Sequence, residues 1–256
     1  MVEFERKVRV RNLYDPHSDK PYKLSRSRLD NFIRCAHCFY LDRRLGVNQP
    51  SIPGYTLNSA VDALLKKEFD GYRKLGETHP LMKEHGIDAI PFAHPSLDDW
   101  RANFKGITFH HSETNFTITG AVDDIWITPN QELIVVDYKA TSVKADITAE
   151  THLRTGYRRQ LEIYQWLFKK NGFQVSSTGY LVYANGLKNR EQFDQKLEFS
   201  MTILPYRGDS SWVERRIYQA HQCLNNETPP PVSAWCGHCA YRNNAALVLA
   251  GTIERQ

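Results

Sequence analysis

The chain has 256 residues, of which 41% are hydrophobic and 24% are charged, a balance that excludes a chain dominated by intrinsic disorder. Its length suits one large α/β domain, and its net charge of +4 permits a nucleic-acid partner without requiring one. No apolar run is long enough to cross a bilayer, and the charged first residues lack a signal-peptide core. We therefore expect a cytoplasmic protein with no membrane partner.

Two helices are predicted in the first third of the chain. The first starts near residues 24–27, Leu-Ser-Arg-Ser, where serines of the N-cap type precede apolar residues, and it leads to the Cys-Ala-His-Cys segment at 35–38. The second runs from about Leu57 to Leu75 with its apolar residues on one stripe. Asp62 lies near the edge of that stripe and Glu68 close to its middle, so either acid could face the interior.

Three consecutive antiparallel strands are predicted in the middle of the chain, over residues 107–111, 116–127 and 132–139. The second of them is rich in β-branched and aromatic residues. It is followed by Thr-Pro-Asn-Gln, which is typical of a turn. The third is apolar on both faces, which is typical of a strand covered on both sides.

Two acids and a lysine are expected to converge on the last two of these strands. Asp137 and Lys139 are two residues apart and so point to one face of the sheet, and Asp123 on the neighbouring strand can face them. A half-buried carboxylate is costly unless it is paired or binds a metal, and paired carboxylates suit a hard divalent cation. The lysine would then hold the attacking water or stabilise the charged transition state. A buried Asp–Lys ion pair is the alternative interpretation.

A long amphipathic helix is predicted over residues 152–170 and ends at Asn-Gly. Gln160 and Tyr164 are four residues apart and share a face of this helix. Its first half is basic, which suits contact with a nucleic acid; the residues are Arg154, Arg158 and Arg159. Two further strands, at 175–183 and 193–204, and a helix from Ser211 to about Leu224 follow.

Four of the five cysteines form two C-x-x-C pairs at opposite ends of the chain, Cys35 with Cys38 and Cys236 with Cys239. In a reducing compartment this pattern indicates metal binding or redox chemistry more than disulfides. Four thiolates suit either tetrahedral zinc or an iron–sulfur cluster. Reduced cysteines without a metal are the alternative. The fifth, Cys223, is expected to be a buried small apolar residue.

Taken in order, these motifs resemble the PD-(D/E)XK nuclease superfamily, in particular its RecB-like branch, which includes the CRISPR-adaptation exonucleases. The resemblance runs from about Leu24 to Arg242. It is carried by an opening S-x-S-x-L…C-x-x-C segment, then G-x-x-D, D-x-K, Q-x-x-x-Y and C-x-x-C-x-Y-R. These motifs begin at Ser25, Gly120, Asp137, Gln160 and Cys236.

The resemblance implies an α/β fold with a restriction-endonuclease-like core, in which helices flank a central mixed β-sheet. The two ends of the chain would be joined by a cysteine metal clasp. The whole chain, residues 1–256, would form a single domain. Its N-terminal helices would occupy 24–75, its catalytic core 107–204 and its C-terminal cysteine segment 228–245.

The resemblance also implies a function, a metal-dependent DNA nuclease that we expect to be an exonuclease. Asp123 and Asp137 would bind Mg²⁺ or Mn²⁺ together with the backbone carbonyl of Tyr138, and Lys139 would position or activate water. Gln160 and Tyr164 would support the site and the DNA strand. DNA, including single-stranded ends, is the expected partner, with a helicase or CRISPR-adaptation protein as a second one. A catalytically weak nucleic-acid-binding protein of the same fold and a redox protein are the alternatives.

The sequence departs from the family pattern at two places. Asp62 stands where the family often has a metal-binding histidine, so Asp62 is the expected third ligand and Glu68 a reserve. Ala245 stands where a last cysteine is expected, and Cys38 is an additional cysteine beside Cys35. Family resemblance favours an iron–sulfur cluster, whereas the paired spacing fits zinc as well, so both remain open.

Overall fold

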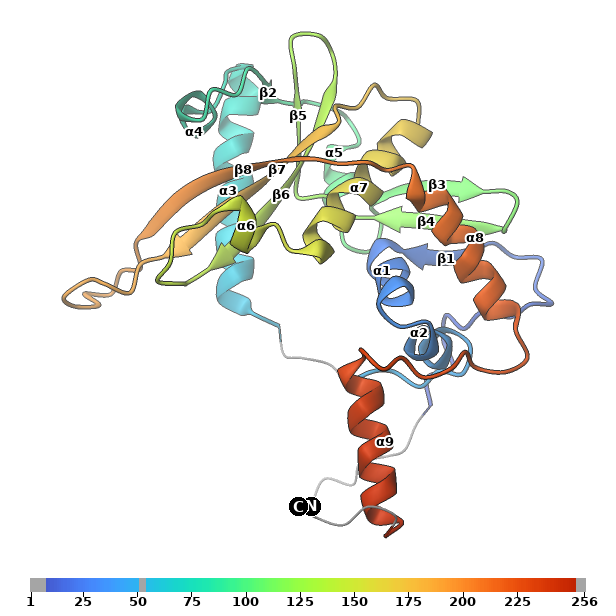
Figure 1. Cartoon of the computed structure of the whole chain (residues 1–256). Coiled ribbons are helices and arrows are strands. Elements are labelled where there is room, and N and C mark those ends of the chain that lie inside the picture. The colour runs from blue at the N-terminus through green and yellow to red at the C-terminus, as the bar shows by residue number, and fades with distance from the viewer. Residues whose placement is uncertain (1–7, 51–53, 252–256) are drawn as a thin grey trace. The chain divides into compact units, whose positions relative to one another are not determined.

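The structure, a computed structural model, describes residues 8–50 and 54–251 (Figure 1). The chain divides into two compact units, which are described separately. The cysteine unit consists of Met1–Ile52, His110–Ile118 and Glu214–Gln256, and the sheet unit consists of Pro53–Phe109 and Thr119–Val213. No helix in the described part of the chain is both long and apolar enough to pass through a membrane.

A mixed sheet is the framework of the sheet unit, as the family resemblance implied, and it has five strands. The strand order is β2 (Ile90–Pro91), β5 (Asp124–Ile127), β6 (Leu133–Thr141), β7 (Thr178–Gly186) and β8 (Phe199–Arg207). β6 and β7 are parallel, and the other neighbours are antiparallel. A parallel pair needs a crossover connection, which α6 (Ala149–His152) and α7 (Thr155–Lys170) provide here.

β6 contributes side chains to both faces of this sheet, and the two faces have different neighbours. Ile134, Val136 and Tyr138 on one face join a buried apolar cluster with Leu65 and Phe69 of α3 (Thr56–Leu75). Because successive strand side chains alternate, the odd-numbered residues of β6 point to the opposite face. α7 covers that opposite face, and in Figure 1 the strands run between α3 and α7.

The two long helices of the sheet unit, α3 and α7, end where their sequences predict. α3 stops at Gly76, whose φ of 68° is the left-handed conformation that glycine adopts without strain. α7 buries every residue from 160 to 168, so its second half is enclosed on all sides. Two short helices, α4 (Pro80–Glu84) and α5 (Leu97–Arg101), lie between α3 and β3 (Ile107–His111), the first of the three predicted strands.

The cysteine unit contains helices from both ends of the chain. They are α1 (Arg26–Arg34), α2 (Ala36–Arg43), α9 (Gly237–Leu249) and all but the first two residues of α8 (Trp212–Asn225). A three-stranded sheet has the order β1 (Tyr22–Ser25), β4 (Phe116–Gly120), β3 (Ile107–His111), and the unit boundary passes through its β3–β4 hairpin. Tyr22 packs against Tyr14 and Phe116 with ring centroids 5.3 and 5.6 Å away.

The prediction of one continuous strand over residues 116–127 is wrong. The chain leaves the three-stranded sheet after Gly120 and enters the five-stranded sheet at Asp124, so the three predicted strands do not form one meander. Between them, the Val122 amide donates to the carbonyl oxygen of Trp100 at 3.1 Å instead of to a neighbouring strand. Asp123 therefore lies in the break, immediately before β5.

Two other predictions differ from the structure. The long helix expected from residue 152 is interrupted at Leu153 and Arg154, and Arg154 becomes the extended N-cap of α7. The strand expected at 193–204 begins only at Phe199 and continues to Arg207.

Candidate functional site

Asp137 is the most enclosed acid of the predicted site. Its side chain is 1% exposed, against 24% for Asp123 and 35% for Asp62. Its carboxylate contacts the ammonium group of Lys139 and accepts a hydrogen bond from the side-chain amide of Gln160. The D-x-K motif of β6 and the Q-x-x-x-Y motif of α7 therefore meet at one buried carboxylate. Lys139 lies on the same face of β6 as Asp137, as the alternation of side chains along the strand predicted.

Tyr164 connects α7 to the break in the chain before β5. Its hydroxyl group donates to the carbonyl oxygen of Ala121 at 2.5 Å and accepts from the side-chain amide of Gln160 at 3.4 Å. Gly120 allows this approach, because a Cβ atom there would lie 2.5 Å from Tyr164 Cε1. The predicted G-x-x-D and Q-x-x-x-Y motifs are therefore in direct contact.

We expect Gly120→Ala to destabilise the protein by about 1–3 kcal/mol, because the added methyl group must displace the Tyr164 ring or the backbone. Thermal unfolding of the variant checks this. Gly156→Ala is the matched control, since Gly156 lies in α7 and a Cβ there would meet nothing within 4 Å. If the two variants unfold at the same temperature, close packing of Tyr164 on Gly120 is disproved.

Asp123 and Asp62 are brought together by a residue that the sequence interpretation missed, Lys66 of α3. The Lys66 ammonium group lies 2.8 Å from Asp62 Oδ2 and 3.4 Å from Asp123 Oδ1. The other oxygen of Asp123 accepts a hydrogen bond from the Tyr138 amide at 2.9 Å. The available signal was the spacing of Asp62 and Lys66, four residues apart on one helix face.

The acids of the site keep both lysines charged. Burial lowers the pKa of Lys139, but the opposite charges of Asp137 and Asp123 outweigh it and leave this pKa above its ordinary value. Burial likewise lowers the pKa of Lys66, and Asp123 and Asp62 raise it above the ordinary value. Burial raises the pKa of Asp62, which Lys66 only partly offsets.

The structure distinguishes Asp123 from the adjacent Asp124. Asp124 is fully buried and forms ion pairs with two guanidinium groups, from Arg73 and from Arg101 at 2.8 Å. It also accepts a hydrogen bond from the Tyr138 hydroxyl at 2.7 Å. Asp124 is therefore committed to a buried charge cluster, whereas the partly exposed Asp123 remains accessible to a ligand.

Glu68, the reserve ligand, is engaged elsewhere. Its side chain is 57% exposed and lies 2.9 Å from Nε2 of His79. The His79 ring stacks on Phe69, with centroids 4.2 Å apart. This contact gives Glu68 a structural partner, whereas Asp62 is the acid of α3 that shares Lys66 with Asp123.

Three predicted nucleic-acid-binding arginines lie at the start of α7, ahead of Gln160. Arg154 is its exposed N-cap residue, and Arg159 is partly buried. Arg158 donates to the carbonyl oxygen of Leu153 at 2.7 Å and lies over the ring of Tyr206. Arg158 and Arg159 directly precede Gln160, whose side chain contacts Asp137.

The donor set of Asp62, Asp123 and Asp137 fits a hard divalent cation, which prefers carboxylate oxygens. The Lys66 ammonium group between two of these carboxylates already shows that the position attracts positive charge. The carboxylate oxygens of these three acids do not all lie within 4.8 Å of one another. Within the described residues, the cysteine group is the only one in which three or more such ligand atoms all lie within 4.8 Å of one another.

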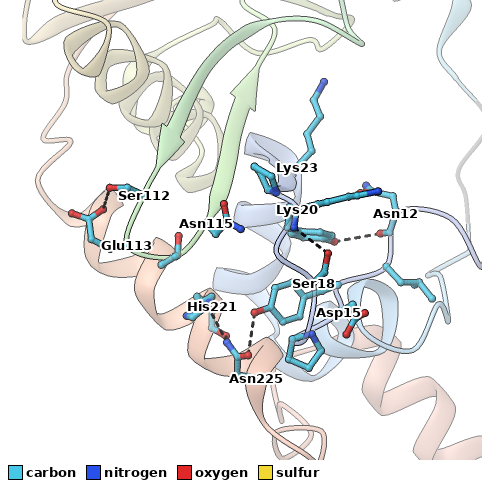
Figure 2. Close-up of a pocket in the computed structure, with 16 residues that line it drawn as sticks. Asn12, Asp15, Ser18, Lys20, Lys23, Ser112, Glu113, Asn115, His221 and Asn225 are labelled. Atoms are coloured by element: carbon cyan, nitrogen blue, oxygen red, sulfur yellow. Dashed lines mark hydrogen bonds between the residues drawn. The ribbon is translucent and has the colours of Figure 1, made fainter.

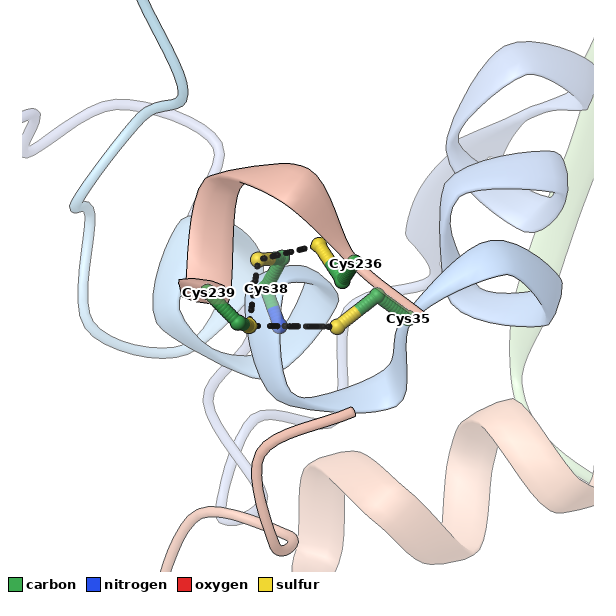
Figure 3. Close-up of side chains that lie close together, drawn as sticks. All are labelled: Cys35, Cys38, Cys236 and Cys239. Carbon is green, nitrogen blue, oxygen red and sulfur yellow. Dashed lines mark hydrogen bonds between the residues drawn. The ribbon is translucent and has the colours of Figure 1, made fainter. Parts of the chain in front are cut away.

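The four cysteines of the two C-x-x-C pairs meet in the cysteine unit (Figure 3). Cys35 and Cys38 come from the start of α2, and Cys236 and Cys239 from the start of α9. Their sulfur atoms all lie within 4.8 Å of one another, and three of the four residues are buried. The two predicted cysteine pairs from opposite ends of the chain therefore meet in one four-cysteine group, whose donors suit a zinc ion or an iron–sulfur cluster.

The cysteine unit also contains a polar cavity of about 580 Å³ (Figure 2). None of the predicted site residues lines it. Its two acids are used locally, because Asp15 accepts from the amide of His17 and Glu113 from the hydroxyl of Ser112. In Figure 2 these two acids lie on opposite sides of the cavity, so they do not form a paired-carboxylate site.

Several solved structures are similar to this chain. That of SSO0001 is 15% identical, with 84% of this chain and 82% of that one covered and a TM-score of 0.39. A phage-related exonuclease from Haemophilus somnus 129PT is 13% identical, with 82% of both chains covered and a TM-score of 0.40. The alkaline exonuclease LHK-Exo from Laribacter hongkongensis is 12% identical, with 89% and 94% covered and a TM-score of 0.34.

No curated protein sequence matches the chain. A family model does match it, over residues 56–244, and the family is the PD-(D/E)XK nuclease superfamily. The matched segment begins at the first residue of α3 and ends within α9, so it includes Asp62, Lys66, Asp123, Asp137 and Lys139. Because it spans well over half of the sequence, the chain belongs to the PD-(D/E)XK nuclease superfamily.

Proposed function

We propose that the chain is a metal-dependent DNA nuclease whose reaction takes place at Asp123, Asp137 and Lys139. One observation carries the proposal, namely the Asp137 carboxylate, which is 1% exposed and contacts both Lys139 and Gln160. A charged acid is costly to bury, and such groups gather at functional sites. In a nuclease superfamily, hydrolysis of a phosphodiester bond is the chemistry that this acid and lysine suit.

The proposed ligands of Mg²⁺ or Mn²⁺ are Asp123 and Asp137, with Asp62 as a third carboxylate and the Tyr138 carbonyl as a backbone ligand. When bound, the ion would polarise the phosphate as a Lewis acid and ease the formation of hydroxide near neutral pH. The Tyr138 amide fixes one oxygen of Asp123 at 2.9 Å, which leaves the other oxygen directed toward Lys66.

Lys139 acts in this proposal as a positioned cation. Asp137 and Asp123 raise its pKa above the ordinary value, and a cation held at this place can orient the attacking water or stabilise the charge on the phosphate oxygens. Its ammonium group also lies 4.6 Å from the centre of the Tyr157 ring. The contact with Tyr157 and the ion pair with Asp137 hold the Lys139 ammonium group in position.

Gln160 and Tyr164 act as positioning residues. Gln160 donates to Asp137 and so fixes the carboxylate orientation, while Tyr164 holds the backbone at Ala121, two residues before Asp123. The arginines at the start of α7 are proposed to contact DNA phosphates, because guanidinium groups form strong, paired hydrogen bonds with phosphate oxygens.

End-labelled linear DNA, single- and double-stranded, and closed circular DNA test the proposal in Mg²⁺, in Mn²⁺ and in EDTA. We expect divalent-dependent release of labelled product from linear DNA and little cutting of the circle, as for an exonuclease. Cutting of the circle would assign an endonuclease instead. Tight, salt-sensitive DNA binding with no turnover in Mn²⁺ would favour the non-catalytic alternative.

We expect Lys66→Met to tighten Mn²⁺ binding about fivefold, the equivalent of about 1 kcal/mol for one partly exposed ion pair. The Lys66 ammonium group competes with a divalent ion for one oxygen of Asp62 and one of Asp123. Calorimetric titration with Mn²⁺ measures the change. Lys67→Met is the control, because it removes an exposed charge from the neighbouring position. Equal affinities in the two variants would show that Asp62 and Asp123 do not share the ion.

A further inference from the structure

We infer that the four-cysteine site holds a single tetrahedral Zn²⁺ ion and not an iron–sulfur cluster. The sulfur atoms define the site closely. Cys38 Sγ lies 3.4 Å from Cys239 Sγ and 3.7 Å from Cys236 Sγ, and Cys35 Sγ lies 3.6 Å from Cys239 Sγ. A zinc ion at about 2.3 Å from each of four thiolates places those sulfurs about 3.8 Å apart. The observed separations therefore match the edges of one zinc–thiolate tetrahedron.

An iron–sulfur cluster needs more space than this arrangement provides. In a four-iron cluster each cysteine binds a different iron, and in a two-iron cluster the two pairs bind irons on opposite sides. Thiolates that bind different irons are then separated by the width of the iron–sulfide core. Here all four sulfur atoms lie within 4.8 Å of one another, and three of their separations are contact distances. The enclosed space suits one ion.

The two C-x-x-C segments have the same local geometry, which suits a shared mononuclear site. Cys35 is the N-cap of α2 and Cys236 the N-cap of α9, and each second cysteine lies in the first turn of its helix. The amide of Cys38 donates to Cys35 Sγ at 3.4 Å. Helix N-termini and their amides stabilise thiolates. Both helices therefore present their positive ends to the four sulfur atoms.

The neighbouring groups leave four thiolates as the ligand set. His37 lies between Cys35 and Cys38, but its Nδ1 lies 2.6 Å from the Pro230 carbonyl oxygen and its Nε2 lies 2.7 Å from a guanidinium nitrogen of Arg242. None of the five cysteines, all within the described residues, forms a disulfide. A tetrahedral four-thiolate site takes zinc or iron, and Zn²⁺ binds such donors more tightly than Fe²⁺.

Metal analysis of the full chain tests the zinc site without any reference to catalysis. The protein is prepared in parallel with and without oxygen, in medium containing both metals, and zinc, iron and acid-labile sulfide are measured. We expect about one zinc per chain, no stoichiometric iron or sulfide, and a colourless protein in both preparations. Stoichiometric iron, with or without sulfide, would overturn the inference. A chain that carries neither metal and fails to bind added Zn²⁺ would also overturn it.

Cysteine variants show which residues hold the ion. Cys236→Ser, at the least buried of the four positions, is expected to lose most of the zinc. Cys223→Ser is the matched control, because Cys223 is buried but outside the four-cysteine site, and it should keep the zinc. If both variants keep their zinc, the ion lies elsewhere. If a variant fails to fold, the metal content of the unmodified chain still decides between zinc and a cluster.

Discussion

Asp137→Asn is expected to lower the rate of DNA cleavage by about a thousandfold or more in both Mg²⁺ and Mn²⁺. Asparagine keeps the shape of the side chain and removes the charge that a divalent ion and Lys139 both require. The fold should remain, because the position still offers an oxygen to the amide of Gln160. Initial rates on end-labelled linear DNA, measured at equal concentrations of folded protein, give the size of the effect.

Asp88→Asn serves as the control for that experiment. Asp88 is an exposed acid of the same unit, in the loop before β2, so the substitution makes the same chemical change away from the site. Its cleavage rate should equal that of the unmodified protein. Cleavage by the Asp137 variant within about threefold of the control would show that this carboxylate does not take part in the reaction.

Asp124→Asn is expected to have the largest effect on stability, a loss of about 3–5 kcal/mol in the free energy of unfolding. Asp124 is fully buried and balances two guanidinium groups, from Arg73 and Arg101. An asparagine fits the space but leaves both cations without their counter-charge, and removing one partner of a buried pair is strongly destabilising. Urea unfolding at neutral pH measures the loss.

Asp123→Asn is the matched variant, since it changes the neighbouring acid. Asp123 is 24% exposed and pairs with Lys66 at 3.4 Å, so its replacement should cost less than about 1 kcal/mol of stability while cleavage is lost. The two variants should therefore separate stability from activity. If Asp123→Asn is the destabilised variant and Asp124→Asn the inactive one, the two acids have the opposite roles.

Local sequence patterns predicted much of the chemistry of the site. The two-residue spacing of Asp137 and Lys139 placed them on one face of a strand, and they form an ion pair there. The four-residue spacing of Gln160 and Tyr164 placed both on one helix face, and their side chains are 3.4 Å apart. In both cases the periodicity of a single element decides the geometry.

Other features depend on groups that are far apart in the sequence. The apolar character of residues 116–127 predicts a single strand. The hydrogen bond from the Val122 amide to the Trp100 carbonyl oxygen helps to divide this segment between two sheets. The sequence likewise contains two adjacent acids at 123 and 124, and only the positions of Arg73 and Arg101 separate their roles. Such tertiary contacts override local propensity.

The most direct test of the proposed site compares Mn²⁺ binding with cleavage in the same samples. Calorimetric titration gives the binding midpoint, and the rate on end-labelled DNA gives the activation midpoint, for the unmodified chain and for Asp137→Asn. The proposed mechanism predicts that the two midpoints coincide in the unmodified chain and that binding at this site and cleavage are both lost in the variant. Cleavage in EDTA, or full cleavage by the variant, would contradict it.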